Sequence, residues 1–478
     1  MTGEWRAMTL EKAPLEIIDG DRGTNYPNQA EFSATGHCLF LNAGNVTTNG
    51  FSFSDCAFIT PAKDALLRKG KLVRHDVVLT TRGTVGNSAY FDASVPFDHI
   101  RINSGMVILR AKQPDLRSRY LYLFIRSALF LSQVAALRTG SAQPQLPIRD
   151  INRIEIPIPP PAEQRAIAHI LGALDDKIEL NRRMNQTLEA MARALFKSWF
   201  VDFDPVRAKQ PKNVGWVSPA ERNPPDKADG GLRGYAANPP YELLPHIADL
   251  FPARLVDSEL GEIPEGWVVK RLGDLFSLDK GLSYKGQHLE GSGVSMVNLG
   301  CFLGQGRFES AALKGYSGEF QPRHTVREGD LVLANTDITQ KRKVLGSPGI
   351  VPPTRDRGAI LFTHHVFAAR FHERLESWKS FAFHTLLRDE FRERATGFAI
   401  GTTVLALPRD AVLDFHFAAP PTAILDAFTK IAQPLLRRQW EAQTESRTLA
   451  ALRDTLLPKL ISGELRVKNA ERKIAQAI

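Results

Sequence analysis

The sequence predicts an α+β fold made of two tandem copies of one unit, each a mixed domain of helices and strands followed by a long helix. The first observation is internal repetition, because the segment 146–175 recurs in form at 407–436. Pro147 and Pro408, which occupy the same place in the two segments, lie 261 positions apart. The second observation is that each repeated segment leads into a long helical pattern of apolar residues. Together the two observations predict a pseudo-two-fold internal repeat.

The two larger domains carry short β-branched segments bounded by Gly or Asp, which predict strands in turn-rich α+β structure. A helical pattern precedes the proline block in each copy. The predicted strands lie at 76–92, 105–112, 266–278 and 329–335, and the predicted helices at 117–137 and 376–395.

The long helices show apolar residues at alternating spacings of four and three, which is the seam of a coiled coil. Pro160 and Pro161 suit the entry into the first helix, predicted from Ala162 to Trp199. The first seam is Ile167, Leu171, Leu174, Ile178, Asn181, Asn185, Leu188, Ala192, Leu195 and Trp199; the second is Phe428, Ala432, Leu435, Gln439, Ala442, Ser446, Leu449, Leu456 and Leu460. Both seams are polar or small in the middle, and polar seam residues fix register. We therefore expect the two helices to pair as an antiparallel coiled coil; two ordinary amphipathic core helices are the alternative.

These patterns divide the chain into six parts. They are two mixed domains at 1–150 and 259–410, two helical segments at 151–200 and 411–465, a Pro/Gly-rich linker at 201–258 and a basic tail at 466–478.

Composition narrows the class of protein. The formal net charge of +9 permits a polyanionic partner. Cys38, Cys56 and Cys301 are widely spaced and odd in number, so they predict neither a disulfide framework nor a metal site. No apolar run approaches the length of a membrane span, and the N-terminus lacks a signal pattern. We expect a cytoplasmic protein.

One motif suggests an enzyme. Asn238-Pro239-Pro240-Tyr241 matches the active-site tetrapeptide of N6-adenine methyltransferases, which act on a flipped-out base. The preceding residues are polar and rich in Pro and Gly, and no strand leads into a Gly-rich cofactor turn. We interpret the motif as linker, with a fused methyltransferase as the alternative. We predict no catalytic, metal or cofactor residue in this chain.

Two similar domains joined by paired helices would present two related faces, and duplex DNA has matching dyad symmetry. The chain also resembles the DNA specificity subunit of type I restriction-modification systems. The resemblance rests on "IPIPPPAEQRAIAHILGALDDKIELNRRMNQTLEAMARALFKSWFVDFDPV", "LVDSELGEIPEGWVVKRLGDL" and "LRDTLLPKLISGEL". It implies two target-recognition domains that read a two-part DNA site. It also implies that the helices bind two methyltransferase subunits, that motor-nuclease subunits join the complex, and that S-adenosylmethionine, ATP and magnesium belong to those partners.

The resemblance also suggests recognition loops, at 80–87 and 139–147 in the first copy and at 334–347 and 396–408 in the second. Arg and Lys there suit phosphates or guanine, and Asn and Gln suit adenine; solvated charges and turn-capping amides are the alternative. The second copy lacks the Gln-Pro-Gln of the first. The predicted DNA-binding residues are Arg82, Thr84, Asn87, Gln143, Gln145, Lys341, Arg342, Lys343 and Thr403, and the predicted partner-binding helix residues are Ile167, Leu171, Leu174, Ile178, Leu188, Leu195, Leu449 and Leu456. A scaffold that assembles partner subunits without reading DNA is a further alternative.

Overall fold

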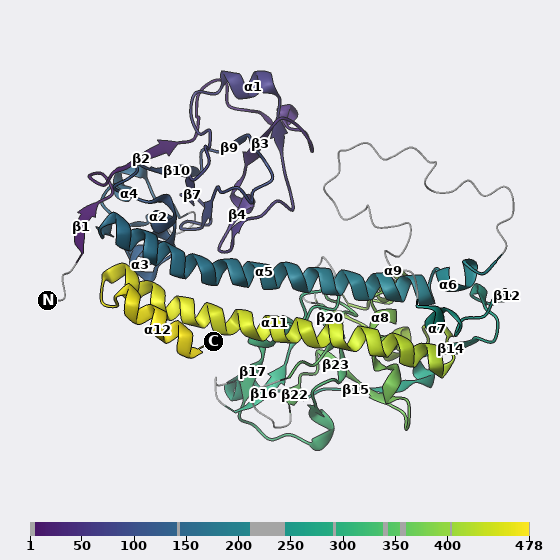
Figure 1. Ribbon diagram of the computed structural model, residues 1–478. Coiled ribbons are helices and arrows are strands. Elements are labelled where there is room, and N and C mark those ends of the chain that lie inside the picture. The colour runs from purple at the N-terminus through teal and green to yellow at the C-terminus, as the bar shows by residue number, and fades with distance from the viewer. Residues whose placement is uncertain are drawn as a thin grey trace. The chain divides into compact units, whose positions relative to one another are not determined.

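A computed structural model describes residues 5–140, 144–210, 244–289, 293–337, 343–353, 360–401 and 404–477. The chain forms two compact units (Figure 1). Unit 1 comprises Met1–Asn181 with Thr444–Ile478, and unit 2 comprises Arg182–Gln443. Each unit therefore contains one mixed domain and a part of both long helices.

Unit 1 has two larger sheets, besides the two-stranded sheets β1-β11 and β4-β5. The larger sheet is antiparallel in the order β2-β10-β7-β8, and a smaller sheet has the order β6-β3-β9, with β3 and β9 parallel. The elements are β1 (Arg6–Thr9), β2 (Leu15–Asp19), β3 (Cys38–Leu41), β4 (Val46–Thr47), β5 (Gly50–Phe51), β6 (Phe58–Ile59), α1 (Pro61–Leu66), β7 (Val77–Thr80), β8 (Ser88–Tyr90), β9 (Ile100–Ile102), β10 (Met106–Ala111), α2 (Ser118–Ile125), α3 (Ala128–Leu137), α4 (Ile148–Ile151), β11 (Glu155–Ile158) and α12 (Val467–Ala477). β7 is buried along its whole length, which explains its continuous run of β-branched and aliphatic residues.

Unit 2 repeats this topology. Its antiparallel sheet has the order β15-β23-β19-β21, and its second sheet has the order β17-β16-β22-β18, with β16 and β22 parallel. The elements are α6 (Asp204–Arg207), α7 (Pro245–Ala248), β12 (Leu255–Ser258), β13 (Gly261–Pro264), β14 (Val268–Arg271), β15 (Phe276–Lys280), β16 (Val294–Val297), β17 (Lys314–Tyr316), β18 (Thr325–Val326), β19 (Leu331–Ala334), β20 (Thr336–Asp337), β21 (Pro348–Ile350), β22 (Ile360–Phe362), β23 (Val366–Phe371), α8 (Lys379–Thr385), α9 (Asp389–Gly397), β24 (Leu405–Ala406), α10 (Arg409–Leu413) and β25 (His416–Ala419). The matching strand orders confirm the internal repeat predicted from the sequence.

The long helices are α5 (Pro161–Phe200) and α11 (Thr422–Ser462), and the second runs through Pro434 without interruption. In unit 1, Arg453 of α11 donates to Asp175 of α5 at 2.8 Å, and Asn181 donates to Glu445 at 2.8 Å. In unit 2, the ring of Phe428 lies 5.1 Å from that of Phe200. In unit 1 residue numbers rise along α5 as they fall along α11, so the helices pair antiparallel there, as predicted.

Two predicted helices are each divided in the structure. The pattern at 117–137 forms α2 and α3: the first ends at Ile125, and the Ser127 hydroxyl accepts from the Phe130 N–H to cap the second. The pattern at 376–395 likewise forms α8 and α9. Among the described residues no single helix is long and apolar enough to cross a membrane, although the bent pair α2 and α3 meets that test together.

The segment 466–478, predicted as a basic tail, is largely the helix α12. Gly463 ends α11 in the left-handed conformation that favours glycine, with φ of +81°. The chain then turns back, and Ala470 is fully buried in the core of unit 1. The Arg466 guanidinium lies 4.2 Å from the Trp5 ring centre. The positive charge of this segment is therefore carried on a helix that packs on unit 1.

Candidate nucleic-acid interface

Unit 1 brings together the two loops selected from the sequence. The Leu146 N–H donates to the Thr81 carbonyl at 2.9 Å, and Arg82 pairs with Gln145 in a β-bridge. Gln145 also exchanges backbone hydrogen bonds with Thr139, at 2.9 and 2.8 Å. The three paired residues, Arg82, Gln145 and Thr139, therefore lie opposite one another, and cross-strand partners project to the same face.

The first loop is shaped by its own residues. Gly83 and Gly86 have φ of +71° and +97°, which a side chain would disfavour. The Thr80 hydroxyl donates to the carbonyls of Thr84 and Asn87 across the loop. The Asn87 side-chain amide donates to the Val46 carbonyl at 3.1 Å, so this donor is occupied within the domain. Asn87 thus fits the turn-stabilising alternative, whereas Arg82 and Thr84 are exposed and Gln145 is half-buried.

Unit 2 repeats the arrangement with different residues. The Leu407 N–H donates to the Asn335 carbonyl at 2.8 Å, and Ile400 exchanges backbone hydrogen bonds with Ala406 at 2.9 and 2.8 Å. Ala406 pairs with Thr336 between β20 and β24. Hence Thr336, Ala406 and Ile400 stand where Arg82, Gln145 and Thr139 stand in unit 1. The sequence indicated the two loops but not this position-by-position match.

The first loop of unit 2 is longer than its counterpart. The Thr80 N–H donates to the Asn87 carbonyl, seven positions on, whereas the Ala334 N–H donates to the Ser347 carbonyl, thirteen positions on. Lys343 lies in this longer loop and is exposed. The other predicted DNA-binding residues, Gln143, Lys341, Arg342 and Thr403, lie outside the described residues, as does the tetrapeptide Asn238–Tyr241.

A histidine pair supports the loop of unit 2. The Thr336 hydroxyl and His365 Nδ1 lie 2.9 Å apart, and Asn335 donates to the His364 carbonyl at 3.1 Å. Burial lowers the pKa of both histidines, and His364 lowers that of His365 further. Within the described ranges no group of three or more His, Cys, Asp or Glu could hold a metal ion. Their role as a support beneath the loop depends on Asn335 and Thr336, which lie 29 positions away in the chain.

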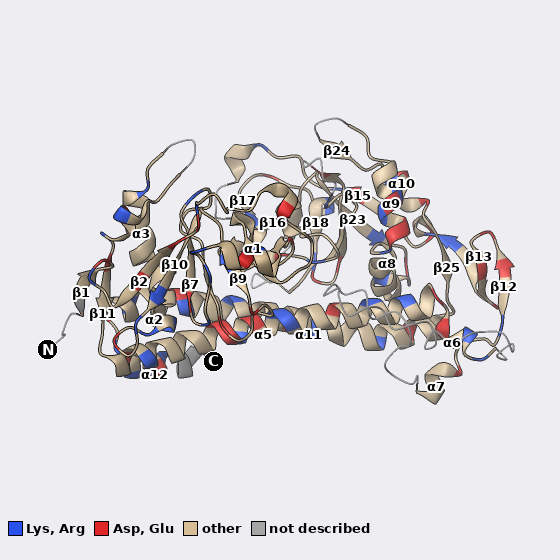
Figure 2. Cartoon of the chain, turned by 90° about the horizontal axis from the view of Figure 1, so that it is seen from above, with Lys and Arg blue, Asp and Glu red and all other residues tan. Residues whose placement is uncertain are grey.

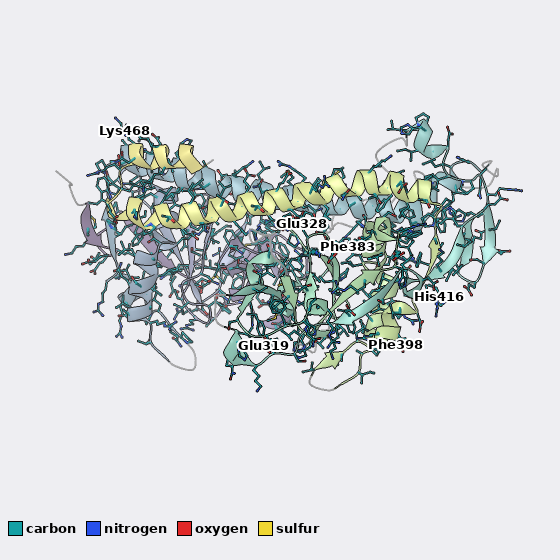
Figure 3. All side chains as sticks on the ribbon, turned by 90° about the horizontal axis from the view of Figure 1, so that it is seen from below. Glu319, Glu328, Phe383, Phe398, His416 and Lys468 are labelled. Atoms are coloured by element: carbon teal, nitrogen blue, oxygen red, sulfur yellow. The ribbon has the colours of Figure 1, made fainter. Side chains whose placement is uncertain are left out.

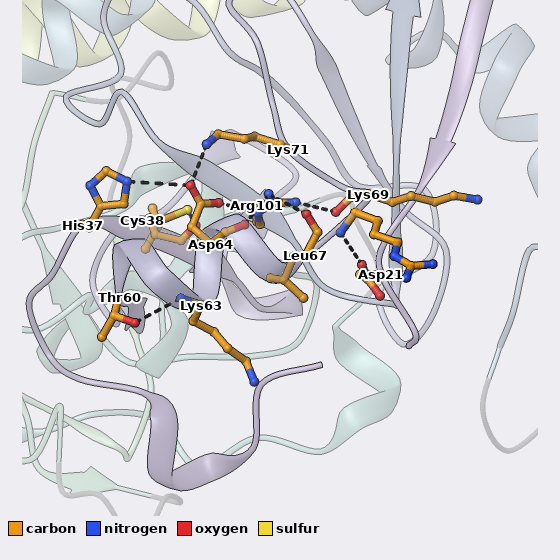
Figure 4. Close-up of polar contacts among 12 residues, drawn as sticks. Asp21, His37, Cys38, Thr60, Lys63, Asp64, Leu67, Lys69, Lys71 and Arg101 are labelled. Atoms are coloured by element: carbon orange, nitrogen blue, oxygen red, sulfur yellow. Dashed lines mark hydrogen bonds and ion pairs between the residues drawn. The ribbon is translucent and has the colours of Figure 1, made fainter. Parts of the chain in front are cut away.

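Unit 1 also contains a buried ionic cluster around Asp64 (Figure 4). Lys71 pairs with Asp64 at 2.6 Å, and the Arg101 guanidinium donates to Asp64 and to the carbonyls of Lys69 and Leu67. Burial alone would raise the pKa of Asp64, but the hydrogen bonds from Lys71 and Arg101 outweigh burial and hold it at about 2. Since Arg101 binds backbone carbonyls as well as the carboxylate, the cluster fastens α1 and the segment after it to β9.

Cys38 lies beside that cluster and is fully buried. Burial raises the pKa of its thiol to about 12. A thiol with so high a pKa is a poor nucleophile at neutral pH. The cluster is therefore structural.

The predicted partner-binding residues of the helices are mostly buried inside the chain. Ile167, Leu171, Leu174, Leu449 and Leu456 belong to the core of unit 1, and Ile178 packs against it. Leu195 belongs to the core of unit 2, and Leu188 is half-buried. The buried ones hold the helices in place, and the role of these residues in binding partner subunits stays a prediction. Leu180 and Met191 are the exposed large apolar residues of α5.

One acidic residue of α5 is largely covered. Asp175 pairs with Arg453 at 2.8 Å and with Arg126 of α2 at 3.0 Å. Arg453 occupies the seam position between Leu449 and Leu456 that the apolar pattern had skipped. Basic and acidic residues are otherwise interspersed over each unit (Figure 2), so charge alone does not mark a candidate nucleic-acid interface.

The known proteins that this chain resembles are specificity subunits of type I restriction systems. Residues 15–190 match the type I restriction modification DNA specificity domain. The type I restriction enzyme HindI specificity subunit of Haemophilus influenzae is 25% identical over 474 residues, covering 93% of this chain and 98% of the relative. The MjaIX specificity subunit of Methanocaldococcus jannaschii is 26% identical over 82% of this chain and 78% of its own length. The crystal structure of the type I restriction-modification S subunit from M. genitalium shares the fold, with a TM-score of 0.55, 14% identity and 96% of each chain covered.

Proposed function

We propose that this chain, which belongs to the family of type I restriction-modification DNA specificity subunits, reads a two-part DNA site with one part assigned to each unit. The family supplies DNA sequence specificity and assembly with other subunits, without a catalytic site or a cofactor of its own. The proposal that the DNA site has two parts rests on the pair of bridged loops that both units contain. Arg82–Gln145–Thr139 in unit 1 and Thr336–Ala406–Ile400 in unit 2 are joined by the same backbone bonds.

We assign the reading of DNA to the domains at 1–150 and 259–410. Within them, the exposed Arg82, Thr84 and Lys343 and the half-buried Gln145 are our candidates for contact with bases and phosphates. Arg82 and Gln145 suit guanine and adenine edges respectively, because each can form two hydrogen bonds to its base in the major groove. Gln143, Lys341, Arg342 and Thr403 remain predictions from the sequence.

The helices α5 and α11 are our candidates for docking two methyltransferase subunits, which motor-nuclease subunits then join in the cytoplasm. Leu180 and Met191 support this assignment, since both are exposed large apolar residues on α5. S-adenosylmethionine, ATP and magnesium would then be held by those partners. The fused-methyltransferase alternative based on Asn238–Tyr241 is set aside, because the relatives matched along most of the chain are specificity subunits.

The test is to map methylated adenines in host cells that carry the partner subunits, with and without this chain. We expect one two-part motif with a fixed spacer that disappears with the chain. Exchanging residues 1–145 for those of a relative should change one part of the motif and leave the other intact. A motif that changes in both parts, or in neither, would contradict the assignment of one part to each unit. Complexes that assemble but bind DNA without sequence preference would favour the scaffold alternative.

A further inference from the structure

The two units present opposite chemistry at matching places of their recognition loops. In unit 1 the bridged residues are Arg82, Gln145 and Thr139, which offer hydrogen-bonding groups. In unit 2 Thr336, which matches Arg82, is buried against His365, and the exposed residues at the matching bridge are Ile400 and Ala406, whose side chains offer none. If unit 1 reads bases by hydrogen bonds, unit 2 must read them at these positions by another kind of contact.

The apolar character of the unit 2 hairpin extends over its described length. Ile400 is 66% exposed, Phe398 is 48% exposed and Val404 is 43% exposed. Single exposed apolar residues are ordinary, but three large ones within seven positions form a cluster. We call Phe398, Ile400, Val404 and Ala406 the apolar hairpin. It lies on the side of unit 2 opposite to α11, as β24 shows in Figure 2 and Phe398 in Figure 3.

The shape of the apolar hairpin suits a groove of DNA. Gly401 has φ of +117°, and a Cβ at that position would lie 2.3 Å from the Val404 carbonyl oxygen. The chain therefore folds back closely on itself, and the single bridge between Ile400 and Ala406 holds its two sides together. The major groove of B-DNA admits a two-stranded ribbon, the kind of element that this short hairpin resembles.

The major groove offers one apolar group to such a ribbon, the C5-methyl group of thymine. The other base edges expose donors and acceptors, and covering them with isoleucine or alanine would leave those groups without partners. We propose that the apolar hairpin recognises thymine methyl groups in the half-site read by unit 2, with Ile400 as the principal contact. This inference rests on the proposed function and adds the chemistry of the base that unit 2 selects.

Deoxyuridine provides a sharp test, because it lacks only the methyl group of thymine. The assembled complex is titrated with duplexes that carry the mapped site, with thymines replaced by deoxyuridine in one half-site at a time. We expect binding to weaken about fourfold for each recognised methyl group that is removed, and only in the half-site of unit 2. Ile400→Ala should weaken binding to the thymine duplex and abolish the response to deoxyuridine, and Ile400→Val should retain part of that response.

Val268→Ala is the matched control, since Val268 is 54% exposed on β14 of the same unit. This variant should keep the full loss of affinity that deoxyuridine causes in the wild-type complex. A unit 2 half-site without any A·T pair would overturn the proposal, as would wild-type binding that is indifferent to deoxyuridine. So would Ile400→Ala binding that weakens equally on both duplexes, an outcome that indicates an apolar wedge between base steps. Failure of the proposed function looks different, because the wild-type complex would then show no preference for the mapped site even with thymine.

Discussion

Asp175→Ala should destabilise unit 1 much more than Asp176→Ala, although each removes an ion pair from the same helix. The Asp175 carboxylate accepts from Arg453 at 2.8 Å and from Arg126 at 3.0 Å, and its side chain is 18% exposed. Asp176 accepts from Arg119 at 3.0 Å, but its side chain is 75% exposed. The two substitutions therefore differ in burial and in the number of partners.

The expected magnitudes follow from those contacts. A hydrogen bond to a charged group contributes about 1.5–3 kcal/mol, and Asp175 makes two. Burial alone would lower the pKa of Arg453, but hydrogen bonds to Asp175 and Asp454 raise it, so Asp454 retains part of the stabilisation. Alanine also favours the helix by about 0.7 kcal/mol at most. We expect a loss of about 2–4 kcal/mol in the free energy of unfolding for Asp175→Ala, and about 0–1 kcal/mol for Asp176→Ala.

The measurement must resolve the units, because a chain with two compact units need not unfold in one step. Hydrogen exchange followed by mass spectrometry in increasing urea reports the local free energy of opening. Peptides from α2 and from residues 444–462 should lose protection at lower urea in Asp175→Ala. A double-mutant cycle with Arg453→Ala should give a coupling of about 1 kcal/mol or more. Equal losses for the two aspartate variants would refute the reasoning.

Three further predictions concern pH and DNA. Burial lowers the pKa of His384 to about 4, whereas the unfolded chain binds this proton near 6.5. The unfolding free energy of unit 2 should thus fall by about 3 kcal/mol as the pH drops from 6.5 to 4, and urea titrations of His384→Phe should lack that slope. The pKa of Asp64 is held at about 2, so its contribution to unit 1 should be present above about pH 4 and decline toward pH 2; unchanged acid unfolding of Asp64→Asn would contradict this. Arg82→Ala should weaken site binding by about 1–3 kcal/mol in equilibrium titrations and relax preference at one base pair; a uniform loss across sequences, with a shallower salt dependence, would instead assign Arg82 to a phosphate.

The sequence by itself determined the features that depend on local periodicity and on repetition. The spacing from Ile167 to Trp199 predicted the first long helix within one residue at either end, because seam positions follow from helical geometry alone. The offset between Pro147 and Pro408 predicted a repeat, and matching strand orders confirm it. The resemblance in the helical segments and in residues 255–275 pointed to specificity subunits, and the comparisons match that kind of protein.

The tertiary structure decided what depends on residues far apart in the chain. Arg453 takes a seam position because Asp175, 278 residues earlier, supplies a buried counter-charge that no pattern of apolar residues reveals. The sequence alone suggests that the Asn87 amide contacts a base, but in the structure that amide donates to the Val46 carbonyl. The exposure of Ile400 opposite Ala406 likewise depends on how a short ribbon closes and projects from unit 2. The periodicity of apolar residues indicates which face of a helix or strand is covered. Which segment covers that face is determined only when distant parts of the chain pack together.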